Sequence, residues 1–260
     1  MNISKPFATV LIPARIESSR LPGKLLKNIQ GIPLIVHVAK RSMNAKHAKR
    51  VIVCTDSYEI IYECEKYQIE VCNTKSDHLN GTERIAEASR ILGLGPKEII
   101  IDVQGDEAFV MPEYIDKVAS FMKNTKFGCV VPHQYIKETN NLNRVKIVSS
   151  AERVIYFSRK DVPCFFGSHE GFMKKHLSII GFSAEALRKY SLSQMTELER
   201  IEKIELFRLI EIGVEIGTFL MEGQSLSVDT KEDYEKACRM MEYDELFKNL
   251  SKERKFEKEV

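Results

Sequence analysis

The sequence predicts an α/β domain built on a mostly parallel sheet, and two observations lead to this fold class. Five short apolar runs, rich in β-branched residues, lack a polar face, as expected of strands covered on both sides. They occupy residues 9–12, 50–54, 70–72, 98–103 and 128–131. Segments with a helical spacing of apolar residues alternate with them, at 33–43, 57–67, 82–92 and 112–122. Strands and helices that alternate in this way form βαβ units, whose strands run parallel.

The alternation fails between residues 134 and 175, where short extended runs at 145–148 and 154–157 predict an inserted antiparallel region. Beyond it, a strand at 177–182, a helix at about 198–212, a strand at 215–220 and a helix at 230–241 complete the core. The chain is therefore expected to divide into a first α/β part (1–133), an insertion (134–175), the completion of the core (176–245) and a charged tail (246–260).

Composition narrows the class of protein. The chain has 260 residues, of which 43% are hydrophobic, so it can bury a full core as one large domain. Its 39 basic and 37 acidic residues nearly balance, which gives no reason to expect a nucleic-acid-binding surface. No signal-peptide pattern and no apolar run of ~20 residues occurs, so we expect a cytoplasmic protein without a membrane segment. Six scattered cysteines without a CxxC pair suit reduced core thiols.

The loop after the first predicted strand gathers cationic and small residues. The sequence ATVLIPARIESSRLPGK, at 8–24, places Arg15, Arg20 and Lys24 in one loop together with serines and a glycine. Loops at the carboxyl ends of parallel strands line the ligand-binding edge of such sheets. Cationic side chains and accessible backbone N–H groups suit phosphate oxygens, although neither GxxxxGK[ST] nor GxGxxG occurs. The loop is predicted to bind an anion, and an ordinary solvated loop is the alternative.

A second motif, VQGDEAF, follows the apolar strand that ends at residue 103. Gly105 predicts a tight bend that directs Gln104 and Asp106 into one cleft. Asp106 is then placed to hold Mg²⁺, a hard cation that prefers carboxylate and phosphate oxygens. In the alternative, Asp106 or Glu107 caps the helix that begins near residue 112, although five residues separate them.

A third motif, SVDTKEDY, begins at residue 227 and precedes the last predicted helix. Thr230 and Asp233 have the spacing of a helix start, with Thr230 as the cap. Asp229 lies one residue earlier and can point into the cleft, where it would pair with Asp106 around a metal and a triphosphate. Taken alone, the motif also allows Asp229 itself to be the cap.

Seven motifs together resemble the CMP-Kdo synthetases, which are 3-deoxy-manno-octulosonate cytidylyltransferases. In chain order they are IPARIESSRLPGK, VCTD, HLNGTERIAE, VQGDE, YFSR, a histidine at 176 that opens a strand, and VDTKED. The resemblance covers residues 7–240, in the family's order. It implies a Rossmann-like nucleotidyltransferase fold and a homodimer. The implied reaction joins CTP to an eight-carbon 2-keto-3-deoxy sugar acid and releases pyrophosphate. The implied role is in building cell-envelope glycan such as lipopolysaccharide.

The resemblance assigns nucleotide binding to the first part (1–133) and sugar binding and dimerisation to the insertion (134–175). It also implies roles for individual residues. The catalytic residues are expected to be Arg15, Lys24, Asp106 and Asp229, with Mg²⁺ held by the two aspartates. The nucleotide is expected to contact Ala14, Arg15, Ser18, Ser19, Lys24, His78, Gly81, Thr82 and Gln104. The sugar acid is expected to contact Arg159, His176 and Glu205. Arg84 either touches a ligand or braces the loop beside it.

Departures from the family pattern lie in segments assigned to the sugar. Leu206 follows Glu205 where the family has Gln, and Ser178, Ile180 and Ser183 stand where Gly, Tyr and usually Arg are expected. The metal turn also has Ala108 in place of Pro. Each lost hydrogen-bond partner would cost a polar substrate roughly 1 to 3 kcal/mol. We therefore hypothesise that the chain uses CTP and that its acceptor is Kdo or a modified Kdo, for example an amino- or deoxy-substituted one.

Two other readings of the same motifs stay open. A synthetase for a sialic-acid-like ulosonic acid would share the fold and the reaction, but its first loop usually differs from IESSR. A catalytically silent nucleotide-binding homologue would explain the altered sugar pocket. The presence of Lys24, Asp106 and Asp229 argues against it, because a chain that only binds nucleotide has little need of the metal pair.

Overall fold

A computed structural model describes residues 5–18, 20–137, 140–164, 166, 172–223 and 226–248. Within them an eleven-stranded mixed sheet has the order β5-β4-β1-β6-β12-β7-β13-β10-β9-β11-β8. Its parallel core, at one end of this order, confirms the βαβ rhythm of the sequence. The core consists of β5 (Glu70–Asn73), β4 (Ala48–Thr55), β1 (Ala8–Pro13) and β6 (Ile99–Val103).

The other half of the sheet is largely antiparallel. Strand β12 (Ile179–Ser183) runs antiparallel to both β6 and β7 (Cys129–Val130), and β13 (Ile216–Gly217) joins β7 in parallel. Antiparallel pairs then link β10 (Arg153–Ser158), β9 (Lys146–Ser150), β11 (Met173–His176) and β8 (His133–Ile136). The antiparallel region predicted at 134–175 is therefore present, while the four-part division of the chain stays a prediction.

Helices cover both faces of the sheet and create two apolar cores. Val10 and Ile12 of β1 pack into one core, whereas Leu11 between them packs into the other. This burial on both sides explains why the strand lacks a polar face. The first core includes residues of α1 (Leu34–Met43), α2 (Tyr58–Lys66), α4 (Pro112–Asn124) and α8 (Lys231–Met241), and the second includes residues of α3 (Gly81–Ile91), α5 (Ala184–Leu192) and α7 (Phe207–Glu211).

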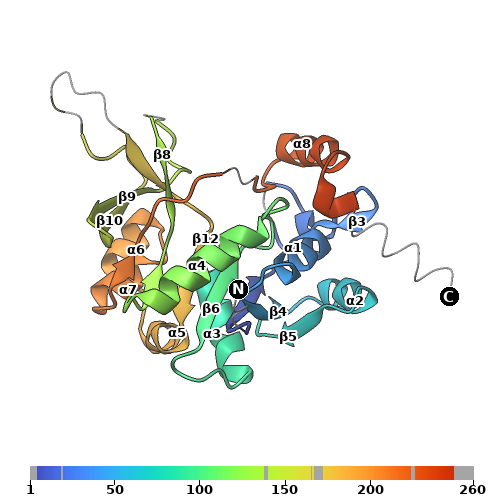
Figure 1. The fold of residues 1–260 in the computed structure, drawn as a ribbon, viewed down its shortest axis with the longest axis horizontal. Coiled ribbons are helices and arrows are strands. Elements are labelled where there is room, and N and C mark those ends of the chain that lie inside the picture. Colours follow the sequence, from blue (N-terminus) through green and yellow to red (C-terminus); the bar gives the residue numbers. More distant parts are fainter. Residues whose placement is uncertain are drawn as a thin grey trace.

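Figure 1 shows how these elements divide between the two sides of the molecule. The antiparallel strands β8, β9 and β10 lie with α6 (Glu197–Glu202) and α7 on one side, and α1, α2 and α8 lie on the other. A short hairpin of β2 (Asn28–Ile29) and β3 (Ile32–Pro33) follows the 3-10 turn η1 (Lys24–Leu26). This turn ends the cationic loop that follows β1.

The structure corrects several expected elements. The single helix expected at 198–212 is broken into α6 and α7, because Lys203 adopts a left-handed conformation with φ of 54°. The helix α5 was not expected; it begins at Ser183, whose side chain accepts a hydrogen bond from the Ala186 N–H. The strand expected at 215–220 is regular only at Ile216–Gly217.

The sequence also predicted the absence of a membrane segment and the presence of reduced core cysteines. Across the described ranges, no helix is both long enough and apolar enough to span a bilayer. All six thiols are free, and four of them are buried, as expected of core cysteines: Cys54, Cys64, Cys72 and Cys129. Most of the predicted tail at 246–260 lies outside the described residues.

Candidate active site

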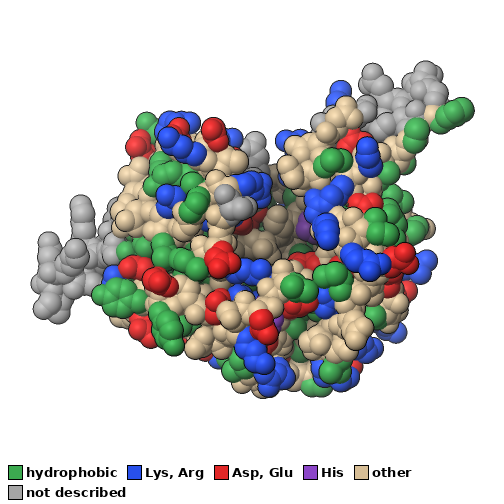
Figure 2. Space-filling view, turned by 180° about the vertical axis from the view of Figure 1, so that it is seen from behind, with side chains coloured by type: hydrophobic (Ala, Val, Ile, Leu, Met, Phe, Trp, Pro, Cys, Tyr) green, Lys and Arg blue, Asp and Glu red, His purple; other side chains and the backbone are tan. Residues whose placement is uncertain are grey.

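A cavity of about 580 Å³ lies beside the ends of β6 and β12, where the parallel and antiparallel halves of the sheet meet. Figure 2 shows a hollow near the middle of one face, with Lys and Arg side chains along its border. Six residues expected from the sequence line the cavity: Gln104, Asp106, Arg159, His176, Glu205 and Asp229. The structure therefore brings together side chains that are far apart along the chain.

Backbone pairing places Asp229 beside Asp106. The segment before α8 forms a bridge with the turn after β6, at Ser227 and Glu107, and the Val228 N–H donates to the Asp106 carbonyl at 2.9 Å. Thr230 is the cap of α8, in a reciprocal capping box with Asp233. Asp229 is therefore free of the capping role and lines the cavity.

The structure excludes the alternative in which Asp106 or Glu107 caps helix α4. Helix α4 begins after Met111, which makes no side-chain cap, so neither Asp106 nor Glu107 caps it. Gln104 and Asp106 both line the cavity, as expected. Gly105 and Asp106 form a turn, as expected, and a Cβ on Gly105 would lie 3.1 Å from the Pro13 carbonyl oxygen and 3.2 Å from Ile35 Cδ1. The glycine is needed for close approach of three segments.

Lys24 connects the two aspartates. Its Nζ donates to Asp106 Oδ2 and, at 2.9 Å, to Asp229 Oδ1. Arg20 Nη2 lies 3.0 Å from the same oxygen of Asp229. Burial opposes the charged form of Lys24, but the two carboxylates outweigh it and raise the pKa of its ammonium group. A positive charge is thus held between two carboxylates from distant parts of the sequence.

The same arrangement suits a magnesium ion. Asp106 and Asp229 present hard carboxylate oxygens that converge on one point, which is the donor chemistry that Mg²⁺ prefers. No cluster of three or more potential metal ligands occurs among the described residues. Two carboxylates fit an ion whose remaining positions are taken by water and substrate phosphate, which is the usual arrangement in nucleotide enzymes.

Arg15 has a guanidinium nitrogen available for a ligand. Its Nη2 atom is buried and has no hydrogen-bond partner within the described residues. Burial, followed by the charge of Arg84, lowers the pKa of Arg15. Arg84 itself is 1% exposed and donates to Thr74 Oγ1 at 2.7 Å and contacts Asp56 Oδ1 at 2.6 Å. Arg84 therefore links the start of α3 to the segments after β4 and β5, while its Nε is buried without a hydrogen-bond partner among the described residues, so both roles stay open for it.

The residues assigned to the base lie near the end of β1. A Cβ on Gly81 would lie 3.3 Å from Pro13 Cγ and 3.7 Å from Gln104 Nε2, so these segments are neighbours. Gln104 Nε2 donates to both oxygens of Asp102, at 2.9 and 3.1 Å, and burial raises the pKa of that carboxyl group. This contact turns the amide carbonyl of Gln104 away from Asp102.

Other residues assigned to the nucleotide adjoin the cavity without lining it. Ala14 is buried, and Ser18 is half-buried in the loop after β1. Thr82 is buried near the start of α3, and His78 Nε2 lies 2.8 Å from Glu87 Oε2. Ser19 lies outside the described residues.

Arg159 is held by backbone carbonyl groups. Its guanidinium donates to the carbonyls of Glu202 at 2.6 Å, Leu142 at 3.0 Å and Lys203 at 2.7 Å. It thereby satisfies carbonyl groups at the end of α6, which have no partner within the helix. Three of its five N–H groups are used in this way, and two remain for the cavity that Arg159 lines. Arg159 has a structural role that the sequence did not indicate.

His176 and Glu205 complete the polar wall. Burial, with a smaller effect of Lys175, lowers the pKa of His176 to about 4, so its ring is neutral near pH 7. Burial raises the pKa of Glu205, against the opposing hydrogen bond from Thr82 N–H, whose nitrogen lies 3.5 Å from Glu205 Oε2. Three of the four departures from the family pattern in the sugar segments, Ser178, Ile180 and Leu206, also line the cavity.

Sequence reasoning missed several lining residues: Asn80, Met195, Glu199, Lys203 and Ile204. Arg20 was recognised as part of the cationic loop but received no role. The α6–α7 residues carry no local motif, because a broken helix with mixed charges resembles an ordinary solvated surface. Their place in the site follows from the break at Lys203, which could not be read from periodicity.

Comparison with known proteins now bears on these observations. The Cytidylyltransferase family model matches residues 9–216. The chain is 36% identical over 242 residues to the 3-deoxy-manno-octulosonate cytidylyltransferase of Wolinella succinogenes, covering 89% of this chain and 98% of that protein. It is 38% identical over 245 residues to the enzyme of the same name from Pectobacterium carotovorum, with 90% and 98% covered. A solved structure of CMP:2-keto-3-deoxy-manno-octonic acid synthetase complexed with CTP aligns with a TM-score of 0.84 at 28% identity, over 91% of this chain and 99% of that one.

The mixed α/β sheet, the cationic loop after β1 and the paired aspartates define a nucleotidyltransferase. The relatives narrow this class further. The chain belongs to the CMP-Kdo synthetase family and is a CTP-dependent cytidylyltransferase.

Proposed function

We propose that the chain transfers CMP from CTP to the anomeric hydroxyl of a 3-deoxy-2-ulosonic acid, either Kdo or a modified Kdo such as an amino or deoxy variant. One observation carries this proposal: Asp106 and Asp229 converge on Lys24 at the wall of a cavity that also contains Arg159 and Glu205. Charged groups for a metal triphosphate and polar groups for a sugar acid therefore share one space. The relatives that match most of the chain carry the corresponding name.

The reaction needs positioning and charge neutralisation. The sugar hydroxyl loses its proton and forms a bond to the α-phosphorus of CTP, while the bond from that phosphorus to the bridging oxygen breaks and pyrophosphate leaves. No covalent enzyme intermediate is required. The free Nη2 of Arg15 and the ammonium of Lys24 are the groups that bind the negative triphosphate. Ser18 and Ser19 are assigned to assist them.

Asp106 and Asp229 would hold Mg²⁺, which supplies Lewis-acid polarisation of the phosphoryl oxygen and acidifies the attacking hydroxyl. With the ion held there, Lys24 would donate to phosphate oxygens in place of the carboxylates. The charge of Mg²⁺ would then lie beside both carboxylates, and the ammonium group of Lys24 would neutralise part of the charge of the triphosphate.

The base is assigned to the segment around the start of α3. Ala14, Gly81 and Thr82 are assigned to the base by the family resemblance, and the amide of Gln104 is oriented by Asp102. His78, held by Glu87, completes the set. A fixed pattern of this kind discriminates between pyrimidine edges, because a mismatched base leaves buried polar groups without partners.

The sugar acid is assigned to the opposite wall. The two remaining N–H groups of Arg159 suit its carboxylate, and neutral His176 and Glu205 suit its hydroxyls. Ile180 and Leu206 add apolar surface to that wall, which favours an acceptor that lacks a hydroxyl or carries an apolar substituent there.

A pyrophosphate-release assay tests the proposal. Purified protein is given CTP, Mg²⁺ and a panel of Kdo, amino- and deoxy-substituted Kdo, and a sialic acid. Turnover of Kdo or of a substituted Kdo, with no turnover of the sialic acid, supports the proposal. Turnover of the sialic acid alone would replace it with a synthetase for a different ulosonic acid. CTP binding without turnover of any acid would favour the silent homologue.

We further propose that the chain forms a homodimer through its antiparallel region. Large apolar side chains on this region are exposed, namely Tyr135 (52%), Leu142 (53%), Ile155 (50%) and Phe172 (60%). The rings of Tyr135 and Phe172 lie together, with centroids 6.3 Å apart, and adjoining exposed apolar side chains are typical of a surface covered by a partner.

A further inference from the structure

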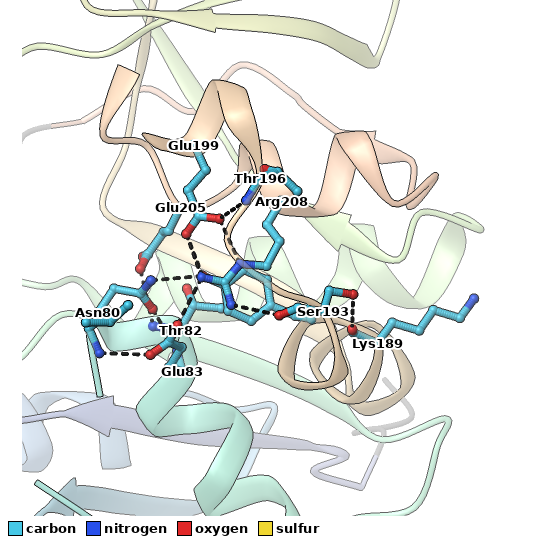
Figure 3. Close-up of polar contacts among 11 residues, drawn as sticks. Asn80, Thr82, Glu83, Lys189, Ser193, Thr196, Glu199, Glu205 and Arg208 are labelled. Carbon is cyan, nitrogen blue, oxygen red and sulfur yellow. Dashed lines mark hydrogen bonds and ion pairs between the residues drawn. The ribbon is translucent and has the colours of Figure 1, made fainter. Parts of the chain in front are cut away.

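Behind the wall of the cavity, a buried arginine joins the segments assigned to the two substrates. Arg208 of α7 is 3% exposed and does not line the cavity itself. Figure 3 shows its side chain surrounded by polar groups from α3, α6 and the loops beside them. Its contacts fall into two sets, one toward the nucleotide side and one toward the acceptor side.

Toward the nucleotide side, Arg208 acts through Glu83. Arg208 Nη2 donates to Glu83 Oε1 at 2.9 Å, while Glu83 Oε2 accepts from the Leu79 N–H at 2.8 Å. Asn80 caps α3 by accepting from the Glu83 N–H at 2.8 Å. The turn formed by residues 79–82 is therefore fixed through a carboxylate that Arg208 holds, and this turn contains Gly81 and Thr82, two of the residues assigned to the base.

Toward the acceptor side, Arg208 forms a bidentate pair with Glu199. Its Nε donates to Glu199 Oε2 at 2.8 Å and its Nη2 to Glu199 Oε1 at 2.7 Å. Glu199 lies on α6 and lines the cavity, and Arg208 lies one turn after Glu205 and Leu206, which line it too. Bidentate contacts fix orientation as well as distance. The break between α6 and α7 is thus held at a definite geometry.

Tyr190 of α5 closes the network. Arg208 Cζ lies 4.0 Å from the centre of the Tyr190 ring, and the Tyr190 hydroxyl accepts from Asn80 Nδ2 at 2.9 Å and donates to Glu199 Oε1 at 3.4 Å. One aromatic ring therefore contacts the arginine and both of the segments that it joins. Thr82 N and Glu205 Oε2, 3.5 Å apart, mark where these segments meet at the cavity.

Charge adds a second reason for an arginine here. Glu83, Glu199 and Glu205 gather near a site that has to accept a triphosphate and a sugar carboxylate. Arg208 neutralises the first two through direct contacts. A lysine could keep the charge but could not reproduce the planar set of contacts to two carboxylates and a ring.

From this geometry we propose that Arg208, supported by Tyr190, is a positioning residue that sets the nucleotide turn at 79–82 and the acceptor wall at 199–206 relative to each other. The inference rests on the assignment of these two segments under the proposed function. It predicts that a change at Arg208 weakens CTP binding although Arg208 touches no substrate, and that it raises the KM for the acceptor as well.

The test compares Arg208→Lys with Arg41→Lys. Arg41 is a matched control because it is also buried, at 1% exposure, and does not line the cavity. It pairs with Asp244 at 2.7 Å, donates to the Val110 carbonyl at 2.9 Å and lies over an aromatic ring. Binding of CTP with Mg²⁺ is measured by calorimetry without any acceptor, and thermal unfolding is measured for each variant. We expect both variants to lose stability, and only Arg208→Lys to raise the Kd for CTP, by about tenfold.

Kinetics add a second readout for the same variants. With the acceptor that the wild-type enzyme uses best, Arg208→Lys should raise the KM for CTP and for the acceptor more than it lowers kcat. An unchanged Kd for CTP in Arg208→Lys, with a loss of stability equal to that of Arg41→Lys, would show that Arg208 only stabilises the fold and would overturn the proposal.

Two further variants keep the test decisive. Tyr190→Phe retains the ring and removes the hydroxyl that contacts Asn80, so it should raise the Kd for CTP even if Arg208→Lys does not fold; no rise would count against the proposal. In Glu83→Gln the link from Arg208 to the turn is weakened, and the double variant with Arg208→Lys should bind CTP no more weakly than the worse single one. CTP binding is measured without any acceptor. If no sugar acid reacts, the acceptor assignment fails, but the Kd values for CTP still test the role of Arg208.

Discussion

At the residue scale, the contact of Lys24 with two carboxylates determines what removal of either acid does. Without the Asp229 carboxylate, Lys24 retains Asp106, and Arg20 loses the acid that it contacts at 3.0 Å. The fold should therefore tolerate this change better than catalysis does. A neutral side chain would, however, remove one of the two groups assigned to Mg²⁺.

We expect Asp229→Asn to lower kcat by about a hundredfold or more and to raise the Mg²⁺ concentration needed for half-maximal rate. The rate is measured as a function of Mg²⁺ at saturating CTP. Asp116→Asn is the control, because Asp116 accepts from the His47 N–H at 2.8 Å and does not line the cavity. An unchanged Mg²⁺ dependence in Asp229→Asn would contradict the assignment of this acid to the metal.

Single residues were predictable where a motif ties them to a strand end. Asp106 and Asp229 follow or precede regular elements, so topology alone directs both to one edge of the sheet. Arg159 was assigned to the sugar on the basis of its motif, whereas its bonds to three carbonyl groups depend on where α6 ends. Arg208 has no motif of its own, because all of its partners come from other elements.

At the element scale, the hairpin of β9 and β10 depends on a buried lysine. Lys146 is fully buried, and its Nζ donates to the carbonyls of Asn141 at 3.1 Å and Arg159 at 2.6 Å and contacts Asp161 at 2.9 Å. It therefore fixes the backbone of the residue whose side chain lines the acceptor wall. An unpaired buried charge is costly, so the pair is sensitive to loss of one partner.

Lys146→Met should reduce the free energy of unfolding by about 3 to 5 kcal/mol, since it leaves Asp161 and two carbonyl groups without this donor. It should also raise the KM for the acceptor more than the KM for CTP. The double variant with Asp161→Asn is expected to recover part of the stability. Urea unfolding and steady-state kinetics provide both values, and equal effects on the two KM values would contradict the link to Arg159.

His133 joins β8 to the segment after β13 and is expected to make stability depend on pH. The backbone N–H of His133 donates to the Phe219 carbonyl, and its ring Nδ1 lies 2.8 Å from Thr218 Oγ1. Burial lowers the pKa of the His133 ring to about 4. The unfolded chain, with a histidine pKa of about 6.5, then binds more protons than the folded chain between these two values. Stability contributed by neutral His133 is present above about pH 6.5 and is lost as the pH falls toward 4.

We expect the wild-type protein to lose up to about 1.4 kcal/mol per pH unit in this window through His133, and His133→Asn to lose less. Denaturant unfolding at several pH values from neutral to weakly acidic measures the difference in slope. Parallel curves for the two proteins would show that His133 does not titrate on unfolding in this range.

Elements whose apolar residues follow a clear strand or helix pattern were predictable from the sequence. Elements whose bounds depend on contacts with other elements were not. The parallel strands and α1 to α4 are close to their expected bounds, because burial on both faces leaves an apolar run in each strand. The division of 198–212 into α6 and α7 depends on the left-handed Lys203, whose carbonyl is bound by Arg159. A lysine gives no local indication of that conformation, which favours glycine and asparagine.

At the scale of the whole molecule, one sheet extends from the nucleotide part to the proposed dimer region. We expect the wild-type protein to sediment as a dimer. Replacing Tyr135 and Phe172 together by Glu should give a monomer, because charges would then lie in the apolar contact. Tyr58→Glu is the control, since Tyr58 is 80% exposed on α2 and lies outside this region. Sedimentation velocity distinguishes the outcomes, and a monomeric wild-type protein would refute the proposed assembly.

The space at Gly105 has a consequence for how such an enzyme acquires a new acceptor. A single added methyl group there would press on the Pro13 carbonyl and on Ile35, so the strand that carries the cationic loop, the helix beneath it and the acid turn cannot be shifted independently. Ile180 and Leu206 also line the cavity, but they pack into the second core and not into this contact. Diversification of the substrate would therefore proceed by exchanging side chains on one wall, while the chemistry of CMP transfer is inherited unchanged.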